Sequence, residues 1–325
     1  MSAERGPAGL AIGVDIGGSK AAAGVVDTDG RVLELVRRPT PRMDAELTED
    51  VIAELVRDLS SRYDVDAVGV GAAGWVAADR ATILFSPHLA WRDEPLREAL
   101  RTRLGIPIWI ENDANAAAWA EYRFGAARGH TAILCITLGT GIGGGLVLDG
   151  ALYRGAFGVA GEWGHMRVVP GGRRCACGNR GCWEQYASGR ALARDARELA
   201  DSSPFAARRL IELAGHAGAL EGTHVTAAAQ EGDPAALEVL AEAGTWLGQG
   251  IADLAAILDP AVVVVGGGVS EVGDLLLGPA RERYSAVLTG RGYRPELMIR
   301  AAELGAAAGL VGAADLARQS ARSRS

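Results

Sequence analysis

The sequence has a single lysine and no basic cluster. Its 325 residues carry a formal net charge of −7, and Lys20 is the only lysine among 33 basic residues. Nucleic acids and anionic membrane surfaces bind proteins through clusters of positive side chains, so this charge balance argues against both kinds of partner. We attribute the use of arginine in place of lysine to genome composition, which says little about mechanism.

Targeting and membrane-spanning segments are missing as well. The apolar stretch nearest to a membrane span, residues 251–265, carries Asp253 and Asp259, whereas a transmembrane helix needs about 20 mostly apolar residues. Residues 1–9 have neither the basic start nor the apolar centre of a signal peptide. We find no linker, low-complexity segment or solenoid repeat. The chain is long enough for two domains of ordinary size, and its 49% hydrophobic residues are enough to fill their cores.

Cysteine is scarce, but three of the four cysteines lie close together, after a histidine and among glycines. Three thiolates and one imidazole form the tetrahedral ligand set that structural zinc prefers. The glycines between the cysteines allow the sharp turns that would point the thiolates inward. A single residue separates the first two cysteines, where common zinc ribbons have two or more, so reduced thiols without metal remain the alternative. The predicted zinc knuckle consists of His165, Cys175, Cys177 and Cys182.

The fourth cysteine, Cys135, lies in the apolar run 132–136 and is expected to be a small buried hydrophobic residue. Because the other thiols would be committed to zinc, a reducing compartment, the cytoplasm, is the expected location.

Two carboxylates flank the predicted knuckle. Glu162 precedes His165, and Glu184 follows the last cysteine, so a bound metal would also fix two acidic groups in space. Carboxylates accept hydrogen bonds from hydroxyl groups, and two of them can orient a sugar ring. The alternative is that both are ordinary surface acids beside a structural staple.

Hydrophobic patterning indicates two related α/β units. A strand, a glycine turn, a second strand and an Asp-Gly hairpin follow one another within residues 12–35, and the same layout recurs from residue 133 to the turn at Asp149-Gly150. Such units would place their glycine turns on opposite walls of a ligand cleft. The expected strands are residues 10–16, 22–26, 32–36, 67–70, 106–110, 133–138, 261–265 and 297–301, and the expected helices are residues 46–63, 114–124, 235–258 and 306–317.

Three glycine-rich turns, residues 15–20, 139–145 and 266–268, each follow an apolar strand. Glycine lets a backbone approach a ligand closely and donate its N–H groups to an anion. Phosphate is the expected anion. Asp15 suits a magnesium ion that bridges the phosphates. The second turn could clamp the same phosphates, and the third could hold a base and ribose. Each turn alone is more often a tight hairpin, and neither a Rossmann nor a Walker sequence is present.

Asp113 is the candidate catalytic residue. It follows a buried strand and opens a helix, which would present its carboxylate at the edge of a cleft. One reading makes it the general base for a sugar hydroxyl, with Asn112 hydrogen-bonded to a neighbouring hydroxyl. The other reading makes Asp113 or Asn112 an ordinary helix N-cap.

Together these residues resemble the sugar kinases of the ROK family (repressor, open reading frame, kinase), most closely its actinobacterial-type glucokinases. The matching motifs extend over nearly the whole chain: residues 13–18, 111–113, 138–141, 162–165, the knuckle and 266–268. The resemblance implies a two-domain actin-like, ribonuclease H-like ATPase fold. It also implies one domain of residues 1–117 with 304–325, to which the last helix returns, and a larger domain of residues 118–303.

The same resemblance implies ATP-dependent phosphorylation of a hexose, most readily glucose, at its 6-hydroxyl, with ATP, Mg²⁺ and structural Zn²⁺ as cofactors. Asp113 would be the base. The implied sugar contacts are Gly74, Asn112, Glu162, His165 and Glu184, so His165 would serve both zinc and sugar. The implied nucleotide contacts are Asp15, Gly17, Gly18, Ser19, Lys20, Gly139, Thr140, Gly141, Gly266, Gly267 and Gly268. A homodimer or homotetramer is expected by resemblance only.

Two positions depart from the family pattern. Ser19 stands where threonine is common and keeps a hydroxyl, while His88 replaces a frequent asparagine and leaves open which hexose is preferred, for example N-acetylglucosamine or mannose. A sugar-sensing regulator would need several helices before residue 10 to bind DNA, and only a short polar lead precedes it. A kinase-like protein without activity is disfavoured by the presence of Asp15 and Asp113.

Overall fold

The computed structural model describes residues 9–322. Residues 1–8, which hold most of the segment tested for a signal peptide, and residues 323–325 lie outside the described part. The described chain divides into two compact units. Unit 1 contains residues 9–129, 145–161 and 303–322, and unit 2 contains residues 130–144 and 162–302. The domain boundaries expected from the sequence differ from the bounds of these units and remain a prediction, as does the expected cleft.

Unit 1 is built on a five-stranded sheet with the order β3-β2-β1-β4-β8. β1, β2 and β3 are antiparallel neighbours, whereas β4 and β8 continue the sheet parallel to β1. The predicted Asp-Gly hairpin is present, because Gly30 has a φ of 81° and its N–H donates to the Asp27 carbonyl at 3.2 Å. The strands are β1 (Ala11–Ile16), β2 (Lys20–Val26), β3 (Val32–Pro39), β4 (Ala67–Ala72) and β8 (Ile108–Asn112).

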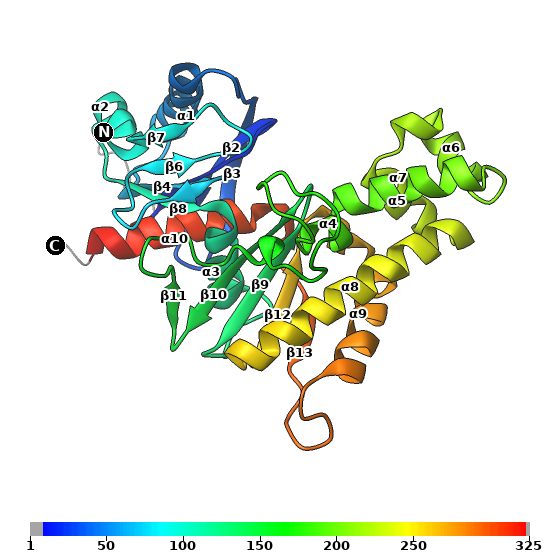
Figure 1. Ribbon diagram of the computed structural model, residues 1–325. Helices are drawn as coiled ribbons and strands as arrows, with labels where there is room; N and C mark the ends of the chain where they lie inside the picture. Colours follow the sequence, from blue (N-terminus) through cyan, green and yellow to red (C-terminus); the bar gives the residue numbers. More distant parts are fainter. Residues whose placement is uncertain (1–8, 323–325) are drawn as a thin grey trace. The chain divides into compact units, whose positions relative to one another are not determined.

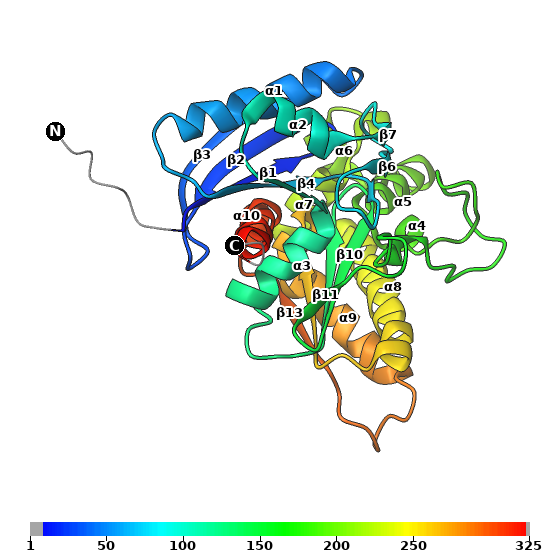
Figure 2. The same ribbon diagram turned by 90° about the vertical axis from the view of Figure 1, so that its left-hand side faces the viewer.

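Helices cover both faces of this sheet (Figure 2). α1 (Ala45–Ser60) and α2 (Leu96–Leu104) lie on one face, and α3 (Asp113–Phe124) and α10 (Ala308–Arg322) lie on the other. α10 approaches the strands very closely: a Cβ on Gly13 would lie 1.8 Å from the Leu310 carbonyl oxygen, and a Cβ on Gly69 would lie 1.9 Å from that of Ala313. Glycine at both positions is therefore a packing requirement.

A small sheet in unit 1 was not predicted. It consists of β5 (Trp75–Val76), β6 (Ile83–Phe85) and β7 (Arg92–Glu94), which pair in antiparallel order. Strands of two or three residues are too short to show an alternating pattern, so they could not be predicted from the sequence.

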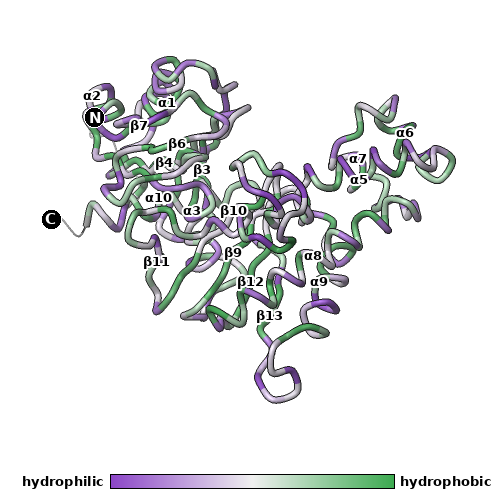
Figure 3. The backbone as a smooth tube through the Cα atoms, in the orientation of Figure 1, coloured by the Kyte–Doolittle hydropathy of each residue, from purple (hydrophilic) through white to green (hydrophobic). Residues whose placement is uncertain are grey.

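The second sheet repeats the strand order of the first: β11-β10-β9-β12-β13. The recurrence expected from the sequence is thus confirmed at the level of topology. β9, β12 and β13 belong to unit 2 and run parallel, and β9 and β12 are coloured as strongly hydrophobic in Figure 3. The strands are β9 (Ile133–Leu138), β10 (Ile142–Leu148), β11 (Ala151–Tyr153), β12 (Val262–Gly266) and β13 (Met298–Ala301).

Unit 2 is otherwise mostly helical, and its longest helix, α8, was predicted from the sequence. α8 (Pro234–Leu258) lies beside α9 (Asp274–Val287) (Figure 1), and two glycines of α8 allow the contact. A Cβ on Gly244 would lie 2.6 Å from the Leu276 carbonyl oxygen, and one on Gly248 would lie 2.2 Å from that of Ala280. The other helices are α4 (Glu184–Ala187), α5 (Gly189–Ser202), α6 (Arg208–Ala214) and α7 (Gly222–Gln230).

None of the helices within residues 9–322 combines the length and the apolar character that a bilayer span needs.

Candidate functional site

In unit 1, three predicted site residues meet where β8 passes into α3. Asn112 is the N-cap of α3, because its Oδ1 accepts the backbone N–H of Asn115 at 2.9 Å. Its Nδ2 donates to the Gly74 carbonyl at 3.0 Å and to Asp113 Oδ1 at 3.1 Å. Asp113 is the first helical residue, and its Oδ1 also accepts the Ala114 N–H at 2.9 Å. The capping role thus falls to Asn112, and the Asp113 carboxylate is held by local bonds.

Sequence reasoning gave no role to Glu111, which precedes this corner. Its side chain is fully buried, and Oε1 accepts the backbone N–H of Asn112 at 3.1 Å. Across the sheet, Glu111 aligns with Gly71 of β4, and Gly71 aligns with Asp15 of β1. Asp15 and Asp113 therefore lie at the same carboxyl edge of the parallel strands, where α/β proteins usually bind ligands.

The first glycine turn joins β1 to β2. The Gly17 N–H donates to the Lys20 carbonyl at 3.1 Å, and Ser19 and Lys20 are exposed. A Cβ on Gly18 would lie 2.9 Å from the Cβ of His88, so the segment carrying His88 abuts this turn directly. The residue that departs from the family pattern is thus a neighbour of the predicted phosphate turn.

Asp15 is the titratable group at this turn whose ionisation is most perturbed. Burial raises the pKa of its carboxyl from 3.8 to about 6, and the Lys20 ammonium opposes the rise. A bound divalent cation would favour the ionised form of this carboxyl and so offset the effect of burial on its pKa. The buried position of Asp15 is therefore compatible with a cation site.

We expect Asp15→Asn to stabilise the folded protein at neutral and alkaline pH. A carboxyl whose pKa is higher in the folded state holds its proton more tightly there, so its stabilising contribution is present below about pH 4 and is lost as pH rises through about 6. Because the pKa of this carboxyl rises from 3.8 to about 6, ionised Asp15 lowers the free energy of unfolding by about 3 kcal/mol at neutral pH. Urea unfolding at several pH values would measure it.

The exposed Asp29→Asn variant is the control for loss of one charge. The advantage of Asp15→Asn over the wild type should shrink as the pH falls from about 8 to about 4. An advantage that is the same at every pH would show that titration of Asp15 is not its cause.

In unit 2, the structure brings the predicted knuckle residues together. The ligand atoms of His165, Cys175, Cys177 and Cys182 all lie within 4.8 Å of one another. Within this group, Cys177 Sγ is 3.6 Å from Cys182 Sγ, and Cys175 Sγ is 3.7 Å from His165 Nδ1. Three thiols and an imidazole nitrogen at such spacing fit a tetrahedral zinc ion.

The knuckle is anchored by its own turns and by Trp183. Gly178 and Gly181 have φ of 92° and 79°, which glycine adopts without strain. The fully buried Trp183 donates its indole N–H to the Trp246 carbonyl at 2.8 Å. A Cβ on Gly250 would lie 2.2 Å from this indole, so the glycine of α8 makes room for it.

Both flanking carboxylates lie beside His165. Glu162 Oε2 is 3.8 Å from His165 Nε2, and Glu184 Oε1 is 3.9 Å from His165 Nδ1. Glu184 Oε1 also lies 3.0 Å from Cys175 Sγ. Nδ1 therefore faces the thiols while Nε2 faces Glu162, which leaves the two ring nitrogens for two different partners.

The other two glycine turns lie together at the carboxyl edge of the second sheet. Gly266 aligns with Thr137 near the end of β9, and a Cβ on Gly267 would lie 2.5 Å from the Leu138 carbonyl oxygen. Around Gly141 the space is limited by Glu184, whose Oε2 would be 2.6 Å from an added Cβ. Gly141 belongs to a turn predicted to bind phosphate, and Glu184 is a predicted sugar ligand. Because the two residues are far apart in the sequence, their contact could not be predicted from it.

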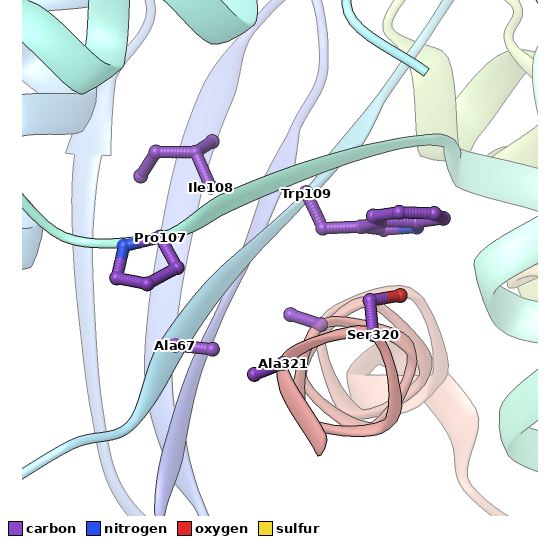
Figure 4. Close-up of a pocket in the computed structure, with 7 residues that line it drawn as sticks. Ala67, Pro107, Ile108, Trp109, Ser320 and Ala321 are labelled. Carbon is purple, nitrogen blue, oxygen red and sulfur yellow. The ribbon is translucent and has the colours of Figure 1, made fainter. Parts of the chain in front are cut away.

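A small hollow in unit 1 is not part of these arrangements (Figure 4). It has a volume of about 40 Å³ and is bordered by Trp109 of β8 and Ser320 of α10, among others. Binding sites for small molecules usually measure about 300 Å³ or more. None of the predicted site residues lines it.

Comparison with known proteins agrees with these features. A glucokinase of Streptomyces coelicolor is 51% identical over 312 residues, which is 96% of this chain and 98% of that protein. The crystal structure of a ROK family glucokinase from Streptomyces griseus in complex with glucose and AMPPNP matches with a TM-score of 0.89 and 53% identity, over 95% of this chain and 99% of that one. The xylose repressor of Bacillus subtilis is 30% identical over 86% of this chain and 69% of its own length.

The fold is accordingly the two-domain actin-like sugar-kinase fold that the motifs predicted. The sequence model of the ROK family matches residues 11–320. The resemblance inferred from the motifs is therefore confirmed, and the chain belongs to the ROK family.

Proposed function

We propose that this protein is a glucokinase, which transfers a phosphoryl group from ATP to the 6-hydroxyl of glucose. The observation that carries the proposal is the corner in which Gly74, Asn112 and Asp113 are joined by hydrogen bonds at the carboxyl edge of the first sheet. The similarity to two Streptomyces glucokinases, one of them bound to glucose and AMPPNP, supports this substrate pair.

Asp113 is the proposed general base. As the sugar hydroxyl oxygen bonds to the terminal phosphorus of ATP, the bond from that phosphorus to the leaving ADP oxygen breaks and the hydroxyl proton passes to the Asp113 carboxylate. Asn112 holds Asp113 by its amide N–H and would orient the sugar. General base catalysis of this kind is worth about 10²–10⁴ in rate, and alignment of the reactants supplies much of the rest.

The carboxylates beside the knuckle are the proposed sugar ligands of unit 2. Glu162 and Glu184 each lie within 4 Å of His165, and all three side chains can form a hydrogen bond with a sugar hydroxyl. Zinc would be held by His165 and the three cysteines; its contribution would be structural, since four protein ligands leave no open position.

The glycine turns are the proposed nucleotide contacts. Their backbone N–H groups would face the phosphates, at residues 17–20 in unit 1 and 139–141 and 266–268 in unit 2. Asp15 would hold Mg²⁺, which supplies positive charge to the phosphates. All four cysteines, each within the described residues, lie outside disulfides, which supports a reducing cytoplasmic location. A homodimer or homotetramer remains a proposal from the resemblance.

The test is ADP release from ATP in the presence of glucose, mannose, N-acetylglucosamine and xylose, with polyphosphate as a second donor. We expect glucose with ATP to give the highest kcat/KM. The identity to a xylose repressor makes a sugar-sensing regulator the second candidate. Binding of a sugar without ADP release would favour that candidate, and turnover with another hexose only would replace glucose as substrate.

We expect Gly141→Ala to weaken glucose binding. The added Cβ would lie 2.6 Å from Glu184 Oε2, so the carboxylate must move away from its position beside His165. Loss of a hydrogen bond to a charged group costs about 1.5–3 kcal/mol, which corresponds to at least about a tenfold rise in the Kd for glucose. Calorimetric titration with glucose measures it.

Gly139→Ala is the matched comparison, because its Cβ would meet nothing within 4 Å in the same turn. Any effect common to both variants reports on the turn itself, and the difference in glucose affinity reports on Glu184. Equal glucose affinity in the two variants would remove Glu184 from the proposed sugar ligands.

A further inference from the structure

We propose that Glu111 is a positioning residue for this reaction, which holds the Asn112–Asp113 corner in place through one carboxylate oxygen. The proposal rests on the proposed function of that corner. Glu111 itself has no route to the substrate, because its side chain is fully buried. It would therefore act only through the residues that it holds.

One oxygen of Glu111 fixes both ends of the turn from β8 into α3. Oε1 accepts the backbone N–H of Asn112 at 3.1 Å and the side-chain N–H of Asn115 at 3.2 Å. Asp113 lies between these two attachment points. A single buried acceptor thus sets the path of the backbone from which the proposed base projects.

The other oxygen is neutralised by arginines. Glu111 Oε2 accepts a hydrogen bond from Arg154 Nε at 2.9 Å. It also forms ion pairs with Arg154, whose Nη2 is 2.8 Å away, and with the buried Arg80. A buried carboxylate without such partners would take up a proton and lose its charge. The two arginines give this buried carboxylate oppositely charged partners, and a charged oxygen is the stronger acceptor for Asn112 and Asn115.

The same network reaches the strand that follows Gly74. Arg154 begins a segment whose backbone closes on itself, since its carbonyl accepts the Ala160 N–H at 3.1 Å. Within this segment, Gly158 lies against β5, where an added Cβ would be 2.4 Å from the Val76 carbonyl oxygen. Glu111 therefore links the two chain segments, around Gly74 and Asn112, that form the corner.

Glu121, on helix α3, provides a matched control for Glu111. It is equally buried, with 1% of its surface exposed, and its carboxylate accepts the backbone N–H groups of Ala126, Glu303 and Leu304 at 2.9, 3.2 and 2.8 Å. None of these partners is a predicted site residue. Loss of charge at Glu121 should therefore disturb stability without reaching the corner.

The decisive variant is Glu111→Gln. A glutamine has one oxygen and one NH₂ group, and it cannot accept on both sides. With its oxygen toward Arg154, its NH₂ group faces the Asn112 N–H, so a donor meets a donor. We expect kcat to fall about 10²-fold, and hydrogen exchange at the amides of Asn112, Ala114 and Asn115 to accelerate at least about tenfold.

Glu121→Gln should lower the melting temperature to a similar extent, with kcat within about twofold of the wild type and unchanged exchange at the corner. Arg154→Lys keeps a positive charge but loses the forked contact, and we expect an intermediate kcat. It serves as the second test if Glu111→Gln folds poorly.

Unchanged exchange at the corner in Glu111→Gln would overturn the proposal, and so would equal losses of kcat in Glu111→Gln and Glu121→Gln. Failure of the proposed function is a separate outcome, in which the wild type releases no ADP with any hexose. The exchange comparison still decides the role of Glu111 in that case, because it requires no turnover.

Discussion

Asp113→Asn should reduce kcat by about 10³-fold or more while the Kd for glucose stays within about threefold of the wild type. The asparagine retains an oxygen that can accept the Ala114 N–H, now 2.9 Å from Asp113 Oδ1, so the start of α3 should keep its geometry. What disappears is the negative charge that takes up the hydroxyl proton. ADP release measures kcat, and calorimetry measures glucose binding.

Asp44→Asn is the control for this substitution. Asp44 is a carboxylate at the start of another helix, where its Oδ1 accepts the Leu47 N–H at 3.0 Å and caps α1. Asparagine and aspartate are nearly equivalent N-caps, so turnover and stability should both be preserved. Near-normal turnover in Asp113→Asn would rule out Asp113 as the base.

Cys177→Ala should remove zinc and weaken glucose binding together. The loss of one of four ligands lowers the affinity for zinc. Without the metal, His165 is no longer held in place, and its Nε2 lies 3.8 Å from Glu162, a proposed sugar ligand. Changes in residues that orient functional groups around a metal typically cost about 10–100-fold in affinity or activity. Zinc content per chain and the Kd for glucose are the two measurements.

Cys135→Ala is the matched control, since Cys135 is a buried cysteine of β9 that does not belong to the ligand group. It should keep the metal and the glucose affinity of the wild type. If Cys177→Ala loses zinc yet binds glucose as before, the knuckle is a remote structural staple, and Glu162 and Glu184 do not depend on it.

Most of the fold could be predicted because its elements follow simple patterns. The buried strands β1, β9 and β12 are mostly apolar runs that lead into glycine turns, and α8 has a long helical period after the N-cap Asp233. The repeated layout of the two sheets followed from the repeated order of strand, glycine turn and hairpin. The small sheet β5-β6-β7 was not predicted, because its strands are too short to show an alternating pattern.

The site was predictable where its residues are neighbours in sequence. Cys175, Cys177 and Cys182 share one loop, and Asn112 and Asp113 share one turn. Glu111 stands in the same motif, but its importance depends on burial and on Arg154, which lies 43 residues further along the chain. The approach of Gly141 to Glu184 is likewise a tertiary contact, which no local pattern could indicate.

Phosphorus NMR of the protein with Mg²⁺, ATP and glucose tests the central claim most directly. The account predicts that glucose 6-phosphate and ADP appear in equal amounts with the wild type and that neither accumulates with Asp113→Asn. Formation of inorganic phosphate in place of the sugar phosphate, or equal amounts of product from both proteins, would contradict it.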